Sequence, residues 1–371
     1  MEPQDTFEIF LATLPGLEPM LAEEARDAGF APARTVPGGV VIKGGWPEVW
    51  RANLTLRGAS QVLARIGGFH AAHLAQLDKR ARKFPWGQIL RPDVPLRVEA
   101  TTRKSKIYHA GAAAQRVERA ISEELGVPIA KEAELRLMVR IEDDYCTFSI
   151  DTSGDGLHKR GFKTAMGKAP LRETMAAMFL RRCGYDGTQP VVDPMCGSGT
   201  FVIEAAEIAM GLLPGRGRSF AFERLASFDG DAWDTMRRQG KDKALDLRFR
   251  GFDRDQGAVR MATANADRAG VDAICAFACQ PVAELQPPEG AKGLVMVNPP
   301  YGARIGNKKL LFGLYGALGK VLAERFSGWR VGLVTSDGGL AKATGLPFLA
   351  QDAPVAHGGL KVRLYRTDPL P

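Results

Sequence analysis

The chain has 371 residues, 45% of them hydrophobic and 25% charged, which is typical of a globular protein long enough for two or more domains. No apolar run approaches the roughly 20 residues that cross a bilayer, and the five cysteines form no CxxC pair. The sequence therefore predicts no membrane span, no zinc knuckle and no disulfide framework. It predicts a reducing, cytoplasmic location. The net charge of +8 is in keeping with a polyanionic partner.

The first half of the chain is predicted to form two α+β units. In the first unit we expect strands at 7–11, 40–42 and 61–66 and helices at 17–28 and 46–56. In the second we expect a strand at 96–100, a helix at 111–125, and a hairpin of 135–141 with 146–150. The first unit should end near residue 66.

From about residue 167 onward, strands alternate with long amphipathic helices. The expected strands lie at 190–192, 247–252, 274–278, 293–297 and 330–335, and a hairpin pair is expected within 348–365. This alternation is typical of a parallel sheet that helices cover on both faces. An insertion at 214–244, rich in Gly, Arg, Asp and Trp, is expected to form a loop-and-helix excursion near the site.

A strand, a glycine-rich turn and a helix are predicted across 191–206. Gly197 and Gly199 allow a ligand to approach the backbone, and the helix that follows offers free N–H groups to a carboxylate or phosphate. A dinucleotide fold would need a third glycine where Val202 stands. A methionine carboxylate therefore fits better than a pyrophosphate, and Asp193 would hold the methionine amino group. The candidate cofactor loop is Asp193, Pro194, Met195, Cys196, Gly197, Ser198, Gly199 and Thr200.

The next strand is predicted to end at Asp253, within Gly251-Phe252-Asp253-Arg254-Asp255. A carboxylate at the carboxyl edge of a parallel sheet can accept hydrogen bonds from both hydroxyls of an adenosine ribose. A helix cap is the alternative role for this aspartate. Asp253, with Arg254 beside it, is the candidate ribose site.

A third apolar strand runs directly into Asn298-Pro299-Pro300-Tyr301. The Asn298 side-chain oxygen and the Pro299 carbonyl can accept both hydrogens of an exocyclic base amine and orient its nitrogen toward a sulfonium methyl. Tyr301 would stack on the extruded base. A plain Pro-Pro turn is the alternative. Cys196 could act as a nucleophile, but its place inside the cofactor loop favours packing.

Basic residues interleave with aromatic ones in three stretches, a pattern that suits phosphate pairing with base stacking, although solvated faces are the alternative. The candidate RNA-binding residues are Lys79, Arg80, Arg82 and Lys83 before Phe84 and Trp86; Arg103, Lys104 and Lys106 before Tyr108; and His158, Lys159, Arg160 and Lys163 around Phe162. No set of metal ligands is found, so no metal site is predicted.

With these motifs the chain resembles the bacterial THUMP-domain class I RNA methyltransferases, a group that includes the 23S rRNA guanine-N2 methyltransferase and the archaeal-type tRNA guanine-N2 enzyme. The likeness spans nearly the whole chain. It rests on four stretches in order, at 151–163, 169–177, 193–200 and 298–302.

The resemblance implies a ferredoxin-like segment at 1–66, a THUMP RNA-binding domain at 67–163 and an α/β Rossmann-like methyltransferase domain at 164–371, whose seventh strand is antiparallel. It implies S-adenosylmethionine as cofactor, S-adenosylhomocysteine as product and no metal. Pro170 and Leu171 would lie beside the cofactor. The family's usual acid near the adenine is absent, which leaves Gln280 or backbone for that contact, and Ala303 stands where the family often has glutamate.

The activity implied is methylation of a guanine N2 in structured RNA, 23S rRNA in preference to tRNA, by a monomer without a membrane partner. Because the Asn-Pro-Pro-Tyr turn does not distinguish bases, a DNA adenine-N6 or cytosine-N4 methyltransferase is an alternative. A tRNA guanine-N2 methyltransferase is another. A non-enzymatic alternative is an RNA-binding assembly factor.

Overall fold

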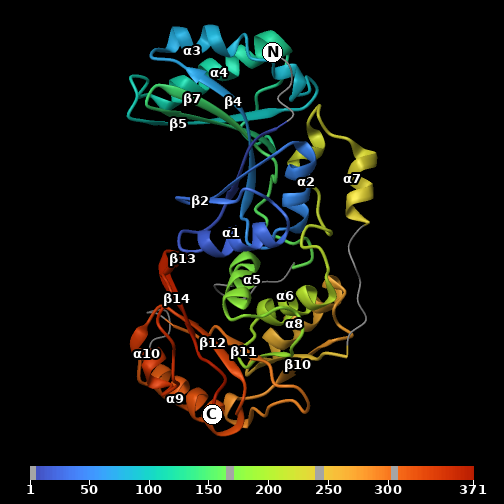
Figure 1. Ribbon diagram of the computed structural model, residues 1–371, viewed down its shortest axis with the longest axis vertical. Helices are drawn as coiled ribbons and strands as arrows, with labels where there is room; N and C mark the ends of the chain where they lie inside the picture. Colours follow the sequence, from blue (N-terminus) through green and yellow to red (C-terminus); the bar gives the residue numbers. More distant parts are fainter. Residues whose placement is uncertain (1–5, 164–170, 239–245, 302–307) are drawn as a thin grey trace. The chain divides into compact units, whose positions relative to one another are not determined.

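A computed structural model describes residues 6–163, 171–238, 246–301 and 308–371 (Figure 1). The chain divides into two compact units. The first comprises Met1–Thr13, Leu21–Leu157 and Arg218–Gln239, and the second comprises Leu14–Met20, His158–Gly217 and Gly240–Pro371. Each unit therefore collects segments that are far apart in the sequence.

The first unit is built on a seven-stranded sheet. Its order is β2 (Arg34–Val36), β3 (Gly39–Gly44), β1 (Phe7–Ala12), β4 (Gln61–His70), β7 (Tyr145–Asp151), β6 (Leu135–Glu142) and β5 (Leu96–Arg103). Only β5 and β6 pair in parallel. Strand β4 is ten residues long and pairs with β1 and with β7. The two expected α+β units therefore share one continuous sheet.

Four helices lie in the chain segments that connect the strands of this sheet: α1 (Glu18–Asp27), α2 (Trp46–Thr55), α3 (Leu74–Ala81) and α4 (Ala110–Leu125). Helices α3 and α4 lie together on one face of the sheet (Figure 1). The His109 imidazole accepts the Ala112 N–H at the start of α4, and Gly126 ends that helix in the left-handed conformation. Helix α3 was not expected from the sequence.

Most of the insertion expected at 214–244, from Arg218 to Gln239, packs within the first unit. Its Phe222 ring stacks on Trp50 at a centroid distance of 6.1 Å, and the Phe228 ring meets Trp50 edge-on at 5.8 Å. The Arg218 guanidinium donates hydrogen bonds to the carbonyls of Ser153, Asp155 and Gly156. Because its aromatic side chains need an apolar partner, this segment, with helix α7 (Gly230–Arg237), is part of the first core.

The second unit is a sheet in the order β10 (Cys275–Cys279), β9 (Phe249–Asp253), β8 (Val191–Asp193), β11 (Leu294–Val297), β12 (Arg330–Thr335), β14 (Leu360–Arg366) and β13 (Val355–His357). The first five strands are parallel, and β14 is antiparallel to β12. The expected Rossmann-like sheet with an antiparallel last strand is confirmed. The strand order reverses between β8 and β11, where ligands of such sheets bind.

Helices cover both faces of this sheet (Figure 1). Along β11, Leu294 and Met296 join one buried cluster, whereas Val295 and Val297 join the other. Both faces of a central strand are thus buried, which is why the strand is apolar throughout. The helices are α5 (Glu173–Arg182), α6 (Thr200–Met210), α8 (Gln256–Ala269), α9 (Lys308–Arg325) and α10 (Gly338–Ala343), and short 3-10 helices lie at Trp86–Gln88, Ala221–Arg224 and Val282–Glu284. Within the described ranges, no helix has the length and apolar character needed to cross a membrane.

Candidate active site

Three polar residues predicted from the sequence meet at the carboxyl edge of the second sheet. Asp193 ends β8, Asp253 ends β9 and Asn298 follows β11. Strand β8 lies between the other two, with Asp193 paired to Gly251 of β9 and Val192 to Val295 of β11. Parallel strands have their carboxyl ends at the same edge of the sheet. Residues about 100 positions apart in the chain therefore lie at the same edge.

The glycine-rich loop after β8 is tied to the end of β9. The Cys196 N–H donates to the Phe252 carbonyl (2.7 Å), and the Gly197 N–H donates to Asp253 Oδ2 (3.0 Å). The second Asp253 oxygen accepts the Asp255 N–H (2.9 Å). Asp255 itself caps α8. The helix-cap role therefore belongs to Asp255, and Asp253 joins the loop to the strand edge.

The Asp193 carboxyl is buried at the centre of this edge, with 2% of the residue exposed. Its Oδ1 accepts the Met195 N–H (3.0 Å), and no lysine, arginine or histidine of the described ranges forms an ion pair with it. Burial, with a smaller contribution from the charge of Asp253, raises the pKa of Asp193 to about 8. A buried carboxyl that lacks a cation is suited to an ammonium group of a ligand.

Replacing either loop glycine with alanine should have unequal effects. Gly199 has φ +85°, and a Cβ there would lie 3.1 Å from both Ala262 Cβ and Ile203 Cδ1, whereas Gly197 has φ +53° with open space around it. We expect Gly199→Ala to lower the free energy of unfolding by about 1–3 kcal/mol and Gly197→Ala by about 1 kcal/mol. Urea unfolding measures both, and equal losses would contradict the crowding described here.

The turn after β11 holds an acceptor without a partner. Asn298 Oδ1 is buried and accepts no hydrogen bond from any described residue. A buried acceptor left unpaired costs about 1–3 kcal/mol, so such atoms in native proteins call for an explanation. The neighbouring Tyr301 ring is half-buried against both core clusters, and burial raises the pKa of its phenol to about 12. The turn therefore holds an unpaired hydrogen-bond acceptor beside a neutral aromatic ring.

Tyr315 of α9 is hydrogen-bonded to this turn. Its side chain is fully buried, and its hydroxyl donates to the Pro300 carbonyl (3.3 Å) and lies 3.2 Å from Thr335 Oγ1. The Thr335 Oγ1 also accepts the Asp337 N–H (3.2 Å). Sequence reasoning missed Tyr315, because a tyrosine in an apolar helix cannot be told from ordinary core by its spacing.

Residues 160–363 match the family described as the RMKL-like methyltransferase domain. This chain belongs to that family. Residues 8–63 match the RlmL ferredoxin-like domain and residues 71–151 match the THUMP domain, in agreement with the resemblance found from the motifs. The second unit is thus a methyltransferase domain, and the site at its strand edge is the candidate site of that domain.

Two curated relatives carry the printed name ribosomal RNA large subunit methyltransferase K/L. The one from Syntrophotalea carbinolica is 37% identical over 358 residues, which is 91% of this chain and 50% of the relative. The one from Vibrio campbellii is 34% identical over 336 residues, 86% of this chain and 48% of the relative. The chain therefore spans about half the length of these relatives.

Solved structures of similar methyltransferases cover nearly the whole chain. One is SMU.472, a putative methyltransferase complexed with SAH, with a TM-score of 0.89, 28% identity and 99% of both chains covered. Another is a predicted N6-adenine-specific DNA methylase from Listeria monocytogenes, with a TM-score of 0.86 and 29% identity over 97% of this chain and 96% of that one. TrmN from Thermus thermophilus shares the fold, with a TM-score of 0.74 and 22% identity over 98% of this chain and 99% of that one.

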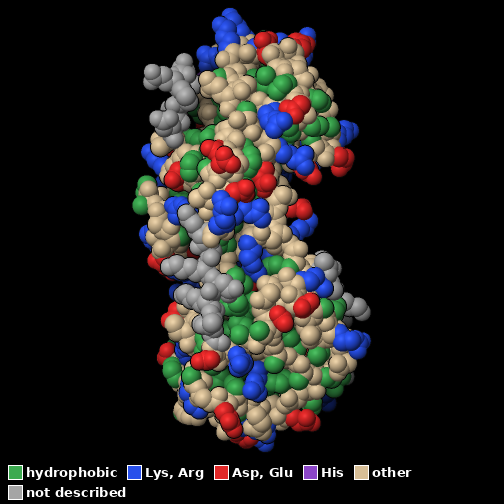
Figure 2. All heavy atoms as spheres, turned by 90° about the vertical axis from the view of Figure 1, so that its right-hand side faces the viewer, with side chains coloured by type: hydrophobic (Ala, Val, Ile, Leu, Met, Phe, Trp, Pro, Cys, Tyr) green, Lys and Arg blue, Asp and Glu red, His purple; other side chains and the backbone are tan. Residues whose placement is uncertain are grey.

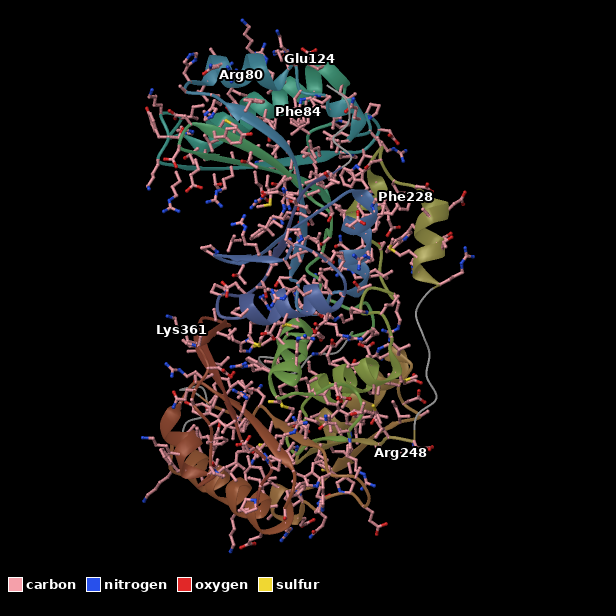
Figure 3. All side chains as sticks on the ribbon, viewed as in Figure 1. Arg80, Phe84, Glu124, Phe228, Arg248 and Lys361 are labelled. Atoms are coloured by element: carbon pink, nitrogen blue, oxygen red, sulfur yellow. The ribbon has the colours of Figure 1, made fainter. Side chains whose placement is uncertain are left out.

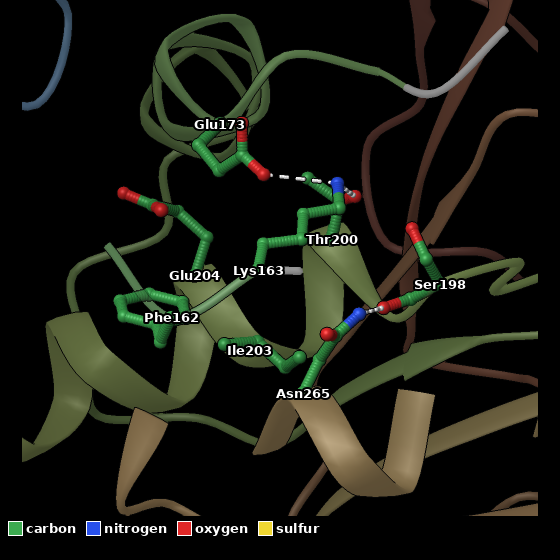
Figure 4. Close-up of a pocket in the computed structure, with 8 residues that line it drawn as sticks. All are labelled: Phe162, Lys163, Glu173, Ser198, Thr200, Ile203, Glu204 and Asn265. Carbon is green, nitrogen blue, oxygen red and sulfur yellow. Dashed lines mark hydrogen bonds and ion pairs between the residues drawn. The ribbon is translucent and has the colours of Figure 1, made fainter. Parts of the chain in front are cut away.

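Lys163 lines a small pocket beside the start of α6 in this methyltransferase domain (Figure 4). Lys163 Nζ lies 2.9 Å from Glu173 Oε1 and 2.8 Å from Thr200 Oγ1. Thr200 is the first residue of α6, so the hydrogen bond from Lys163 joins the end of the candidate cofactor loop to Glu173 of α5. The pocket is lined by Phe162, Lys163, Glu173, Ser198, Thr200, Ile203, Glu204 and Asn265.

The other candidate cofactor residues are distributed around this loop. Burial raises the pKa of the Cys196 thiol, which keeps it protonated and agrees with a packing role. The Gln280 N–H donates to the Asp253 carbonyl (2.9 Å). Arg254 is exposed, and Pro170 lies outside the described residues. Leu171, Pro194, Ser198 and Thr200 are buried, and Met195 is half-buried.

Three of the candidate RNA-binding residues are in the interior instead of on a surface. Arg160 is 2% exposed and pairs with the buried Glu204 (3.1 Å), Phe162 is 8% exposed, and Lys163 holds Glu173. These side chains are covered by the protein and the two cations pair with acids, which the sequence does not indicate, because a basic and aromatic run looks the same whether its charges pair with buried acids or with solvent.

Most other candidates remain accessible. Arg82 is half-buried, and its guanidinium pairs with Asp78, Glu123 and Glu124. Arg80 lies on α3 in the helical layer of the first unit, as does Glu124 on α4 (Figure 3). His158 is half-buried. The exposed candidates are Lys79, Arg80, Lys83, Arg103, Lys104, Lys106 and Lys159.

Proposed function

We propose that this chain transfers a methyl group from S-adenosylmethionine to N2 of a guanine in structured RNA, with 23S rRNA as the substrate. The observation that carries the proposal is the buried, unpartnered Oδ1 of Asn298 at the strand edge beside Asp193. An open acceptor there suits a substrate group with hydrogens to donate, such as an exocyclic amine.

The residues of the cofactor loop fit S-adenosylmethionine. When bound, S-adenosylmethionine supplies an electrophilic methyl group on a sulfonium. Asp193, buried without a cation among the described residues, would hold the methionine amino group. The free N–H groups at the start of α6 would bind the carboxylate. Asp253 would accept hydrogen bonds from the ribose hydroxyls.

The Asn-Pro-Pro-Tyr turn would position the nucleophile. Asn298 Oδ1 and the Pro299 carbonyl accept the two amine hydrogens, which draws electron density onto the nitrogen and aligns it for attack. The nitrogen becomes acidic as the N–C bond forms, so its proton passes to a carbonyl or to water without a strong base. Tyr301 stays a neutral phenol, since its pKa is about 12, and stacks on the base.

The RNA substrate is supported by the THUMP domain at 71–151 and by the printed names of the relatives. On the face in Figure 2, lysine and arginine side chains are interspersed with aspartate and glutamate. The net charge of +8 is not gathered into one patch on that face. RNA contacts on that face would thus come from small basic groups, each with few phosphates.

A DNA adenine-N6 methyltransferase is the second candidate, because the solved structure from Listeria monocytogenes carries that name. Transfer of labelled methyl groups to 23S rRNA, tRNA and duplex DNA separates the two candidates. The proposal predicts label in 23S rRNA well above that in either other substrate. Preferential labelling of duplex DNA would refute it.

Replacing Tyr315 with phenylalanine should slow the reaction by loosening the turn. The variant loses the hydrogen bond to the Pro300 carbonyl but keeps the buried ring, so we expect kcat to fall about tenfold, as for one hydrogen bond of about 1.4 kcal/mol. Cofactor affinity and the KM for RNA should stay within about twofold. Thr335→Val is the matched variant, because it removes the other partner of the Tyr315 hydroxyl. An unchanged kcat in Tyr315→Phe would contradict this role.

A further inference from the structure

The loop between β5 and α4 displays an aromatic ring to solvent. Tyr108 is 85% exposed, the largest exposed fraction of any large hydrophobic side chain in the described part of the chain. Arg103, the last residue of β5, and Lys104 and Lys106 of the loop precede it and are exposed as well. No core contact accounts for a tyrosine at this position, whereas the neighbouring Ile107 is buried and anchors the loop.

The loop is held in place by the turn between β6 and β7. Asp144 Oδ1 accepts hydrogen bonds from Ser105 Oγ (2.7 Å) and from the Lys106 N–H (2.8 Å). These two bonds, the backbone N–H first, lower the pKa of Asp144, so the carboxylate persists at neutral pH. Thr102 Oγ1 donates to the Tyr108 carbonyl (3.1 Å). The ring is therefore displayed by an ordered loop, which reduces the entropy cost of binding a partner.

Lys104 occupies a backbone conformation that disfavours its side chain. Its φ is +47°, in the left-handed region where glycine is most at ease. Asp143 and Asp144 also have positive φ, but a two-residue turn between antiparallel strands requires this, and aspartate tolerates it. Lys104 lies between β5 and α4 and not in a two-residue turn between antiparallel strands, so that requirement does not explain its positive φ. A strained residue on an exposed loop points to a role for the side chain itself.

The charges beside Tyr108 suit phosphate groups. Lys106 Nζ is 4.0 Å from Asp144 Oδ2 and its side chain is 76% exposed, while the Arg103 side chain is 67% exposed although it pairs with Glu142 at 3.4 Å. Exposed pairs of this kind are weak and exchange readily with other anions. One exposed ring flanked by cations matches a single stacked base between phosphates. A lipid surface or a protein partner would call for a broader apolar area.

We propose that Tyr108 stacks on an unpaired base of the RNA substrate while Lys104 and Lys106 bind the phosphates beside it. The inference rests on the proposed function, because it specifies the RNA as one with an unpaired nucleotide within reach of the first unit. Double-stranded RNA would offer this ring no free base face.

The test compares two RNA probes with the full chain, each closed by a non-nucleotide linker so that the stem has no unpaired loop bases: a hairpin carrying an unpaired eight-nucleotide flank, and a blunt hairpin with the same stem. Tyr108→Ala should weaken binding to the flanked hairpin about tenfold and leave binding to the blunt hairpin unchanged. Tyr108→Phe, which keeps the ring, should bind both as the wild type does. Equal affinity of Tyr108→Ala and wild type for the flanked hairpin would overturn the proposal.

Lys104→Gly provides a readout that a purely structural role would not give. Glycine relieves the backbone strain, so the midpoint of thermal unfolding should be unchanged or higher, while the affinity for the flanked hairpin falls and the salt dependence of binding drops by about one phosphate contact. Unchanged affinity and salt dependence would contradict the assignment of Lys104. If the wild type binds neither probe and methylates no RNA, the proposed function fails too. If the wild type methylates RNA and Tyr108→Ala binds the flanked hairpin with the affinity of the wild type, only this inference fails.

Discussion

Replacing Asn298 with alanine is expected to lower the rate of methyl transfer about 100- to 1,000-fold, the range found when one positioned polar group is removed from a reaction centre. Asn298 Oδ1 is buried and has no hydrogen-bond partner among the described residues, so its acceptor capacity is open to a substrate amine. Single-turnover transfer of labelled methyl groups measures the loss. Cofactor affinity, measured by calorimetry, should stay within about threefold, because the proposed mechanism gives cofactor binding to Asp193 and Asp253.

The same variant separates catalysis from stability. Alanine removes a buried acceptor that no described group satisfies, so the midpoint of thermal unfolding should not fall. Asn298→Asp is the matched control, since it keeps an oxygen acceptor at the same place and should retain more activity than alanine. Full activity in Asn298→Ala would refute the mechanism, and loss of activity through unfolding would appear as a lower midpoint.

Replacing Asp193 with asparagine should stabilise the chain at alkaline pH while weakening cofactor binding. Burial raises the pKa of Asp193 to about 8 in the folded chain, whereas an unfolded aspartate titrates near 3.9. Between these two pH values the folded chain holds one more proton than the unfolded chain, so the stability contributed by this group is lost as pH rises toward 8. Asparagine does not titrate, and its oxygen can still accept the Met195 N–H.

Thermal unfolding from pH 5 to pH 9 should therefore show Asp193→Asn above the wild type at pH 8 and above, with a smaller difference at pH 5. Calorimetry should show the affinity for S-adenosylmethionine reduced about 10- to 100-fold, the loss of a charge-assisted hydrogen bond. Wild-type binding below pH 8 should release a proton, which titration in two buffers measures. Wild-type affinity in Asp193→Asn would show that another group holds the amino nitrogen.

The candidate site at the edge of the second sheet could be predicted from sequence, because its three polar residues follow a local rule. Each of Asp193, Asp253 and Asn298 follows an apolar strand, and the parallel pairing of β8 with β9 and β11 brings them together without further information. The distinction between Asp253 and Asp255 required the structure, because both aspartates suit a helix cap and only the hydrogen bonds assign it to Asp255.

Some residues lie in places that the sequence did not predict, because their positions depend on contacts with residues far away in the chain. Arg160 pairs with Glu204, 44 positions away, so its burial has no local signal. The segment around Phe222 joins the first core through Trp50, which no periodicity of the insertion indicates. Strand β4 joins two predicted units because it is longer than its expected apolar part. In each case the outcome was set by tertiary partners and not by propensity.

The most direct measurement is nucleoside mass spectrometry of 23S rRNA, transcribed without modifications and incubated with the purified chain and S-adenosylmethionine. We expect N2-methylguanosine in the reaction with the wild type and none with Asn298→Ala. N6-methyladenosine, another methylated base or no methylated nucleoside in the wild-type reaction would contradict the proposed function.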